Sequence, residues 1–380
     1  MLRDESAKRQ FAVLKRDFYT HLTARFVAKL TYVATRLWLG VCACMLISLQ
    51  VSAAKSMALP YTQPGQDWES ESLPLGNGHL GITVLGGVSE DTIQFNEKTL
   101  WTGGPGSEEG YNFGFPGQPQ SYLNKVKSVQ AELRDKGQLA PEYVAEQLGN
   151  NQTGYGSYQS FGTLQFTWPQ SHGRYQDYRR ELDLSTATAR VQYETDNGRF
   201  VREYFVSYPD NSIVIRLSAS GSDKISFTAS LHTPENRSRQ VKQLSESEVM
   251  YTGTLHNNDL QYAAGLRVIA DDADVTFHAD GAFSVAQASQ VTLVLTAATN
   301  YALQHPTYRG EDAENKVRGQ LAATRGDSYS ELKQNHLDDY QQLFGRVELD
   351  LGGSVITDVA QALANYPSED QDANRALEQL

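Results

Sequence analysis

The chain has 380 residues, 40% of them hydrophobic, and a formal net charge of −12 at pH 7. Its first 54 residues carry 8 Lys or Arg against 3 Asp or Glu, a charge of +5, so the remaining residues carry −17. Such an acidic body disfavours nucleic acid and anionic membranes as partners and suits a neutral substrate. The length allows two domains, or one large all-β domain with helical additions.

The amino-terminal segment has the pattern of an export signal. An uncharged apolar run over residues 37–49 is preceded by an arginine and followed by an A-x-A-like site at residues 51–53. The run is too short for a comfortable membrane span. We therefore predict that residues 1–54 are a signal peptide with a long amino-terminal region, and that the protein is exported to the periplasm or the extracellular space. An uncleaved membrane anchor is the alternative. Both cysteines lie in this run, so we expect no disulfide in the exported chain.

Residues 76–81 match the dinucleotide-binding motif G-x-G-x-x-G formally. That motif needs a buried strand before it and a helix after it. Here a polar, proline-interrupted segment precedes the glycines, and the β-branched, apolar residues 82–85 follow them. We expect a tight glycine turn that leads into a strand, not a nucleotide site.

A helical insertion is predicted next. An apolar stripe with helical spacing indicates one helix, and Pro141 occupies a first-turn position for a second short helix that runs through Leu148. The stripe consists of Leu123, Val126, Val129 and Leu133.

The following region is rich in short apolar runs separated by turn signals. Asp196-Asn197-Gly198 predicts one hairpin, and residues 209–212 predict a second. Residues 291–296 are typical of a buried strand. Regularly spaced short strands predict a mainly β protein with an antiparallel sandwich.

The composition changes after about residue 301. Ser328 and Glu331 form a capping-box pattern, which predicts an amphipathic helix over residues 327–344. His336 falls on its apolar stripe and is expected to be packed rather than to bind a metal. Residues 361–380 are compatible with a helix or a frayed tail.

No pattern indicates a cofactor or a metal. The histidines are scattered, without a second histidine or acid at ligand spacing, and no G-x-S-x-G motif is present. We therefore expect no metal site, no cofactor and no sequence-local nucleophile.

A series of motifs then points to a family. They occupy residues 75–81, 94–105, 158–164, 178–184, 202–210 and 336–352. Their residues and order resemble the amino-terminal part of glycoside hydrolase family 95, the α-L-fucosidases that cleave α-1,2-linked fucose. The resemblance covers roughly residues 60 to 380.

The resemblance implies a large antiparallel β-super-sandwich over residues 60–305 and a helical linker over residues 306–380. In the family, an (α/α)₆ barrel follows, in which a glutamic acid protonates the leaving oxygen and an aspartate activates water, with inversion. The barrel is expected to be absent from this chain, so no catalytic residue is carried over and the chain alone is expected to be inactive.

The predicted function is thus the front part of an exported α-L-fucosidase-like hydrolase that acts on a fucosylated glycan together with its catalytic barrel. A stand-alone, non-catalytic carbohydrate-binding or structural module is the alternative. Fucose and L-galactose remain alternative sugars.

Five residues are candidates for facing the substrate or a neighbouring domain. Glu97 and Asn96 are expected mainly to bond locally, with Glu97 pinning the glycine-rich turn. Trp101 is expected to be buried by core or interdomain packing, unless its ring stacks on a sugar or faces the mouth of the barrel. Tyr158 and Gln159 belong to a glycine-containing loop that either touches substrate or is ordinary surface.

Overall fold

The computed structural model describes residues 57–114, 119–149, 153–168, 174–270 and 272–380. The predicted signal peptide lies outside these residues. Among the described helices, none combines the length and the apolar character that crossing a membrane requires.

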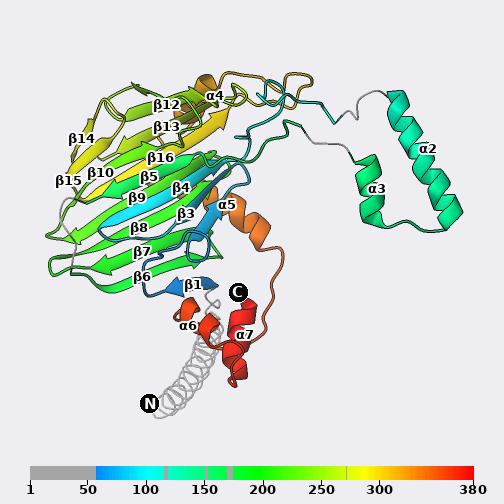
Figure 1. Ribbon diagram of the computed structural model, residues 1–380. Helices are drawn as coiled ribbons and strands as arrows, with labels where there is room; N and C mark the ends of the chain where they lie inside the picture. The colour runs from blue at the N-terminus through cyan, green and yellow to red at the C-terminus, as the bar shows by residue number, and fades with distance from the viewer. Residues whose placement is uncertain (1–56, 115–118, 150–152, 169–173, 271) are drawn as a thin grey trace, which may run out of the picture. The chain divides into compact units, whose positions relative to one another are not determined.

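The described residues form two antiparallel sheets (Figure 1). The strands are β1 (Ala58–Tyr61), β2 (Leu73–Gly76), β3 (Leu80–Val84), β4 (Glu90–Glu97), β5 (Gly162–Thr167), β6 (Gln176–Asp183), β7 (Thr188–Glu194), β8 (Gly198–Ser207), β9 (Ser212–Gly221), β10 (Ile225–His232), β11 (Gln240–Gln243), β12 (Glu248–Thr254), β13 (Gln261–Ile269), β14 (Asp274–Phe277), β15 (Phe283–Ala288) and β16 (Gln290–Thr299). Within this part of the chain, nine strands form one sheet in the order β1-β6-β7-β8-β9-β16-β13-β12-β11, and seven form the other in the order β14-β15-β10-β5-β4-β3-β2. The predicted β-sandwich is confirmed.

The turn signals gave the correct hairpins. β7 pairs with β8 on either side of the Asp196-Asn197-Gly198 turn, and β8 pairs with β9 as far as Ser207 and Ser212. The predicted buried strand over residues 291–296 lies within β16.

The glycine motif joins two strands. β2 pairs with β3 from Leu73 to Gly76, and Gly78 adopts a positive φ of 81° in the turn between them. Such a backbone conformation is cheap only for glycine. A strand follows the glycines, as predicted, and the segment before them is itself a strand.

The core lies between the two sheets. Within it, Phe161 contacts Phe95 of β4 with ring centroids 4.9 Å apart, and Tyr262 of β13 with centroids 5.4 Å apart. All three side chains are fully buried. Aromatic side chains from both sheets therefore meet directly beneath the segment where β4 ends and β5 begins.

The described helices are α2 (Pro119–Lys136), α3 (Pro141–Leu148), α4 (Ala313–Ala323), α5 (Tyr329–Phe344), α6 (Val359–Ala364) and α7 (Gln371–Gln379). The helical insertion is confirmed as α2 and α3, with Pro141 opening α3. Of the predicted stripe, only Val129 is buried, while Leu123 and Leu133 are exposed. The described part of the chain contains no (α/α)₆ barrel.

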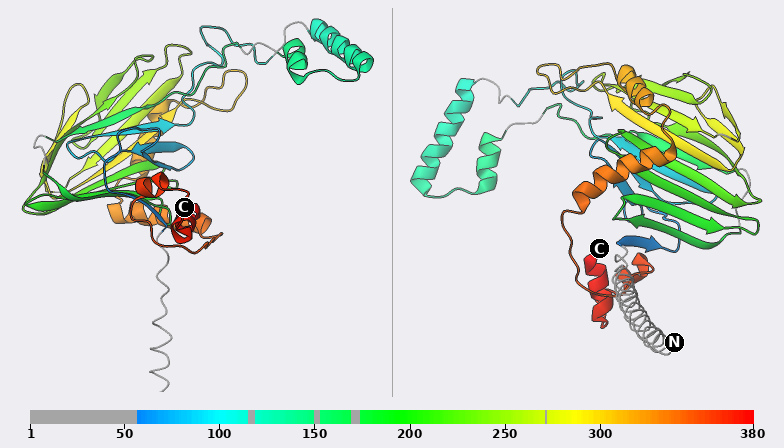
Figure 2. Two further views of the ribbon diagram at one scale, coloured as in Figure 1. Left: turned by 60° about the horizontal axis from the view of Figure 1, so that its bottom comes forward. Right: turned by 180° about the vertical axis from the view of Figure 1, so that it is seen from behind.

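Two helices cover the outer face of the nine-stranded sheet (Figure 2). Val317 and Leu321 of α4 pack on Ala263 and Ala298, and Leu332 of α5 packs on the face of β8, β9 and β16. The central strands are thus buried on both faces, which explains their continuous apolar runs. The capping box of α5 is formed as predicted.

His336 of α5 is buried against this sheet, as predicted. Its Nε2 donates to the carbonyl oxygen of Thr186 at 2.8 Å, and its ring stacks on Phe205 with centroids 4.9 Å apart. Burial lowers the pKa of His336 below its ordinary value, against the opposing effect of the bond to Thr186.

This environment predicts a pH dependence of stability. The unfolded chain protonates the imidazole near about pH 6.5, whereas the folded protein keeps it neutral to lower pH. Stability from His336 is therefore complete above that pH and falls as the pH drops below it. We expect His336→Gln to remove part of the loss in unfolding free energy between about pH 7 and about pH 5, measured by urea denaturation. An identical loss in both proteins would contradict the prediction.

Candidate functional site

Glu97 ends β4, and its side chain is 0% exposed. Its carboxylate accepts from the backbone N–H of Thr99 at 3.0 Å and from Thr99 Oγ1 at 2.8 Å. His79 of the glycine hairpin lies with Nε2 2.8 Å from Glu97 Oε1. The carboxylate therefore fixes the turn after β4 and joins it to the glycine hairpin.

Two asparagines hold the same end of the sandwich. Asn96 Oδ1 accepts from the backbone N–H of Phe161 at 3.2 Å. Asn77 Oδ1 accepts from the backbone N–H groups of His79 and Leu80, and Asn77 Nδ2 donates to the carbonyl of Ser207 at 2.8 Å. Asn96 therefore has a local bonding role, and Asn77 ties the glycine hairpin to β8.

Trp101 and Tyr158 lie side by side at the surface. Their ring centroids are 5.5 Å apart, and an isolated β-bridge pairs the two residues. Trp101 is 47% exposed and Tyr158 is 42% exposed, so the expectation that Trp101 packs in the core is wrong, while packing against a neighbouring domain stays a prediction. The indole packs on Tyr158 rather than in the core, and its Nε1 donates to the carbonyl of Lys98 at 3.0 Å.

Gln159 anchors the Tyr158 loop. Its Oε1 accepts from Asn236 Nδ2 at 2.7 Å, and its backbone N–H donates to the carbonyl of Leu100 at 2.9 Å. These two bonds fix the position of the loop. The neighbouring Tyr158 is the more exposed of the two residues.

Glycines allow the two loops to meet backbone to backbone. Gly104 N–H donates to the carbonyl of Gly154 at 2.6 Å, and Thr102 N–H donates to that of Ser157 at 3.0 Å. A Cβ atom added at Gly156 would lie 2.0 Å from the carbonyl oxygen of Thr102. The loops can therefore approach this closely only because glycine, which has no side chain, occupies position 156.

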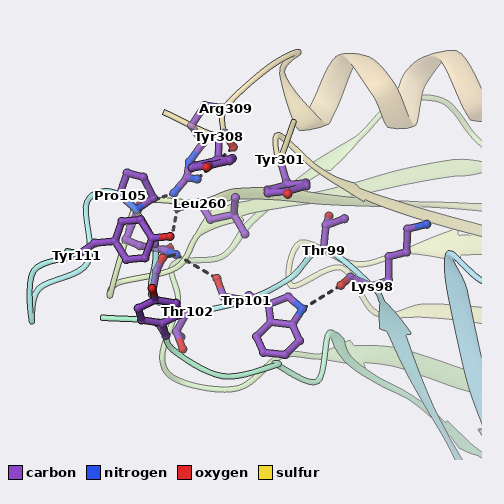
Figure 3. A pocket seen from close by; sticks show the side chains of 14 residues that line it. Lys98, Thr99, Trp101, Thr102, Pro105, Tyr111, Leu260, Tyr301, Tyr308 and Arg309 are labelled. Carbon is purple, nitrogen blue, oxygen red and sulfur yellow. Dashed lines mark hydrogen bonds between the residues drawn. The ribbon is translucent and has the colours of Figure 1, made fainter. Parts of the chain in front are cut away.

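These loops form one wall of a pocket of about 550 Å³, which we call the aromatic pocket (Figure 3). The rings of Tyr301 and Tyr308 are parallel within 4°, with centroids 6.4 Å apart, and Figure 3 shows them side by side. Trp101 lines the same pocket. The remaining lining residues are Lys98, Thr99, Thr102, Gly103, Gly104, Pro105, Tyr111, Tyr155, Asn258, Leu260 and Arg309.

The sequence did not reveal two polar residues of this pocket. Asn258 Nδ2 donates to the carbonyls of Trp101 at 3.0 Å and Gly103 at 2.6 Å. Arg309 Nη2 donates to the carbonyl of Asn258 at 2.9 Å. The Asn257-Asn258-Asp259 run is a turn signal, but no local pattern shows that this turn meets a loop more than 150 residues earlier.

A second pocket of about 500 Å³ adjoins the first and shares Thr99 and Tyr301 with it. His79, Glu97 and Lys316 line it. Lys316 Nζ donates to the carbonyl of Thr299 at 2.9 Å, so its charge is held near the end of β16.

The linings of the two pockets do not contain the pair of carboxyl groups of a glycosidase centre. Glycosidases use two carboxyl groups across the scissile bond. The aromatic pocket is lined by no carboxylate, and the second is lined by Glu97 alone. Tyr158 contacts Trp101 but lines neither pocket. Burial raises the pKa of Tyr158, and the charge of Glu97 raises it further, so this phenol stays protonated and able to donate. Within the described ranges, no group of His, Cys, Asp and Glu could hold a metal ion.

Comparisons with known proteins find relatives over most of this chain. Residues 59–304 match the family described as glycosyl hydrolase family 65, N-terminal domain. The chain is 30% identical over 337 residues to Alpha-L-fucosidase 2 of Arabidopsis thaliana, covering 81% of this chain and 38% of that protein. It is 29% identical over 350 residues to Probable alpha-fucosidase A of Aspergillus niger, covering 85% and 42%, and 24% identical over 362 residues to the protein of that name from Aspergillus oryzae, covering 88% and 47%. The chain spans less than half the length of each of these relatives.

Proposed function

The chain belongs to the family described as glycosyl hydrolase family 65, N-terminal domain, and from this membership we propose that it is the front part of an exported α-L-fucosidase-like hydrolase. The motif resemblance to α-L-fucosidases is confirmed by the relatives, which support a glycoside hydrolase-like function. The proposed reaction is inverting hydrolysis of α-1,2-linked L-fucose, with the catalytic carboxyls supplied by a barrel in the remaining polypeptide. Membrane attachment arises only if the signal is uncleaved.

The aromatic pocket carries this proposal. Exposed rings from the two loops give flat apolar faces on which a sugar ring can stack, and polar groups between them can bind hydroxyls. The two pockets lack a carboxylate pair, so the chain supplies binding surface to a catalytic centre rather than the acid and base. Asn96, Glu97 and Gln159 position the loops, while Trp101 and Tyr158 face the ligand or the neighbouring domain.

Trp101→Ala tests this role in the natural gene product, isolated from its source cells with an antibody to the sandwich. We expect kcat/KM for an α-1,2-fucosylated oligosaccharide to fall roughly tenfold, because truncation of an aromatic contact residue commonly costs more than about 1 kcal/mol. The matched control is Trp68→Ala, since Trp68 is 53% exposed and lines neither pocket. Equal effects of the two changes would show that Trp101 does not contact the substrate. A wild-type product without fucoside turnover would refute the proposed activity.

A stand-alone carbohydrate-binding module is the second candidate. One observation favours it: the exposed rings of Trp101 and Tyr155 line the aromatic pocket, and no Asp or Glu lines it, which suits sugar binding without catalysis. Glycan binding by a gene product that shows no turnover would select this candidate.

A further inference from the structure

The aromatic pocket differs in charge from the rest of the chain. The chain carries a net −12, yet the pocket is lined by two cations, Lys98 and Arg309, and by no Asp or Glu. Figure 3 shows Arg309 beside Tyr308, with Lys98 at the other end of the labelled group. A neutral sugar would not require this exclusion of acids.

Arg309 is the cation best placed to bind a ligand. It is half-buried, and no described residue forms an ion pair with it. Its recorded bonds go to two carbonyl oxygens, those of Asn258 at 2.9 Å and Tyr308 at 3.3 Å. A guanidinium has five N–H donors, so donors remain for an anion in the pocket.

The electrostatic setting agrees with this geometry. Burial lowers the pKa of Arg309, and nearby Asp259 raises it by a smaller effect. The guanidinium is thus partly removed from water without a bonded carboxylate. A bound anion would restore charge-assisted hydrogen bonds, for which the planar guanidinium is well shaped.

The second pocket lacks these properties. Its cation, Lys316, already donates to the carbonyls of Thr299 and Tyr301, and Glu97 lines the same pocket. An anion would be disfavoured there by the like charge of Glu97. The aromatic pocket is therefore the better anion site of the two.

Together these features lead us to propose that the aromatic pocket binds a glycan bearing an anionic substituent, a sulfate ester or a uronate carboxylate. Arg309 binds the anion, and the parallel rings of Tyr301 and Tyr308 support the sugar that carries it. This inference rests on the proposed function for the identity of the ligand as a glycan. The net charge of the whole chain led us to expect a neutral substrate. The charge of this one pocket instead indicates a preference for an anionic ligand.

Calorimetric titration of the full chain tests the preference. The probes are a sulfated fucan oligosaccharide, the same oligosaccharide after desulfation, and an oligogalacturonate. We expect at least one anionic probe to bind about tenfold more tightly than the desulfated one, a margin that shrinks as salt is added. The tighter anionic probe identifies the source of the charge. Equal affinity for all three probes, or binding by none, would overturn the proposal.

Arg309→Gln should abolish the margin while leaving the weaker binding of the desulfated probe in place. Arg309→Lys keeps the charge and should retain part of the margin, which separates lost charge from a distorted loop. Arg199→Gln is the matched control. It removes the same charge, and Arg199 is exposed at the β7–β8 hairpin. A margin that survives in Arg309→Gln would contradict the assignment.

These outcomes are distinguishable from failure of the proposed function. Turnover of a neutral α-1,2-fucoside by the natural gene product, without any anion preference, would leave the hydrolase proposal intact and refute only the anionic ligand. Preference for an anionic glycan without turnover of the fucoside would support the anionic ligand and refute the hydrolase proposal.

Discussion

Asp91→Ala is expected to lower the free energy of unfolding by about 3–5 kcal/mol, because it breaks a buried ion pair and leaves a charge without a partner. Asp91 Oδ2 lies 2.8 Å from Arg202 Nη1, and both side chains are almost fully buried. Asp91 Oδ1 also accepts from the backbone N–H groups of Gly86 and Gly87 at 3.1 Å. The same change therefore frees Arg202 and releases the turn between β3 and β4.

Urea denaturation measures this effect. The matched control is Asp272→Ala, because Asp272 lies 3.9 Å from Lys224 in an exposed pair, and exposed pairs contribute about 0–1 kcal/mol. If Asp91→Ala were no more destabilising than Asp272→Ala, the buried pair would not hold the two sheets together as the geometry indicates.

Gly156→Ala is expected to destabilise the chain by about 2–5 kcal/mol and to abolish glycan binding at the aromatic pocket. Gly156 has a positive φ of 69°, which costs other residues about 1–2 kcal/mol. Its new Cβ would also meet the carbonyl of Thr102 at 2.0 Å, so the loops must separate. Separation breaks the bonds between Thr102 and Ser157, each worth about 0.5–1.5 kcal/mol.

Gly110→Ala is the control for the cost of the backbone conformation alone. Gly110 has a positive φ of 79° and lines neither pocket, and a Cβ atom added there meets nothing within 4 Å. We expect this variant to be destabilised only by the cost of the positive φ, measured by urea denaturation. Its glycan binding, measured by calorimetric titration, should be unchanged. Equal losses of binding in the two variants would show that the close approach of the loops does not shape the pocket.

Local signals in the sequence were sufficient for many elements. Ser328 and Glu331 bond within one turn of helix, and Asp196-Asn197-Gly198 bends the chain between adjacent strands, so their effects can be read without knowing the rest of the fold. The apolar stripe of α2 predicted the helix correctly. It did not predict which face is covered, because Leu123 and Leu133 are exposed.

The aromatic pocket could be predicted only in part. Of its lining residues, Trp101 was found as a candidate through its glycine-rich context, but the expectation that its ring packs in the core was wrong. Tyr158, found in the same way, contacts Trp101 without lining the pocket. Asn258 and Arg309 reach the pocket through the pairing of β13 with β16, which brings distant turns to one end of the sandwich. Their roles depend on that long-range strand register, so they cannot be predicted from the spacing of nearby residues in the sequence.

The central claim, that this chain is part of an α-L-fucosidase-like hydrolase, is tested most directly by proton NMR of the reaction. The natural gene product, isolated from its source cells with an antibody to the sandwich, is incubated with an α-1,2-fucosylated oligosaccharide. The account predicts free L-fucose that appears first as the β anomer, as inversion requires. Absence of fucose from an intact, folded preparation, or first appearance of the α anomer, would contradict it.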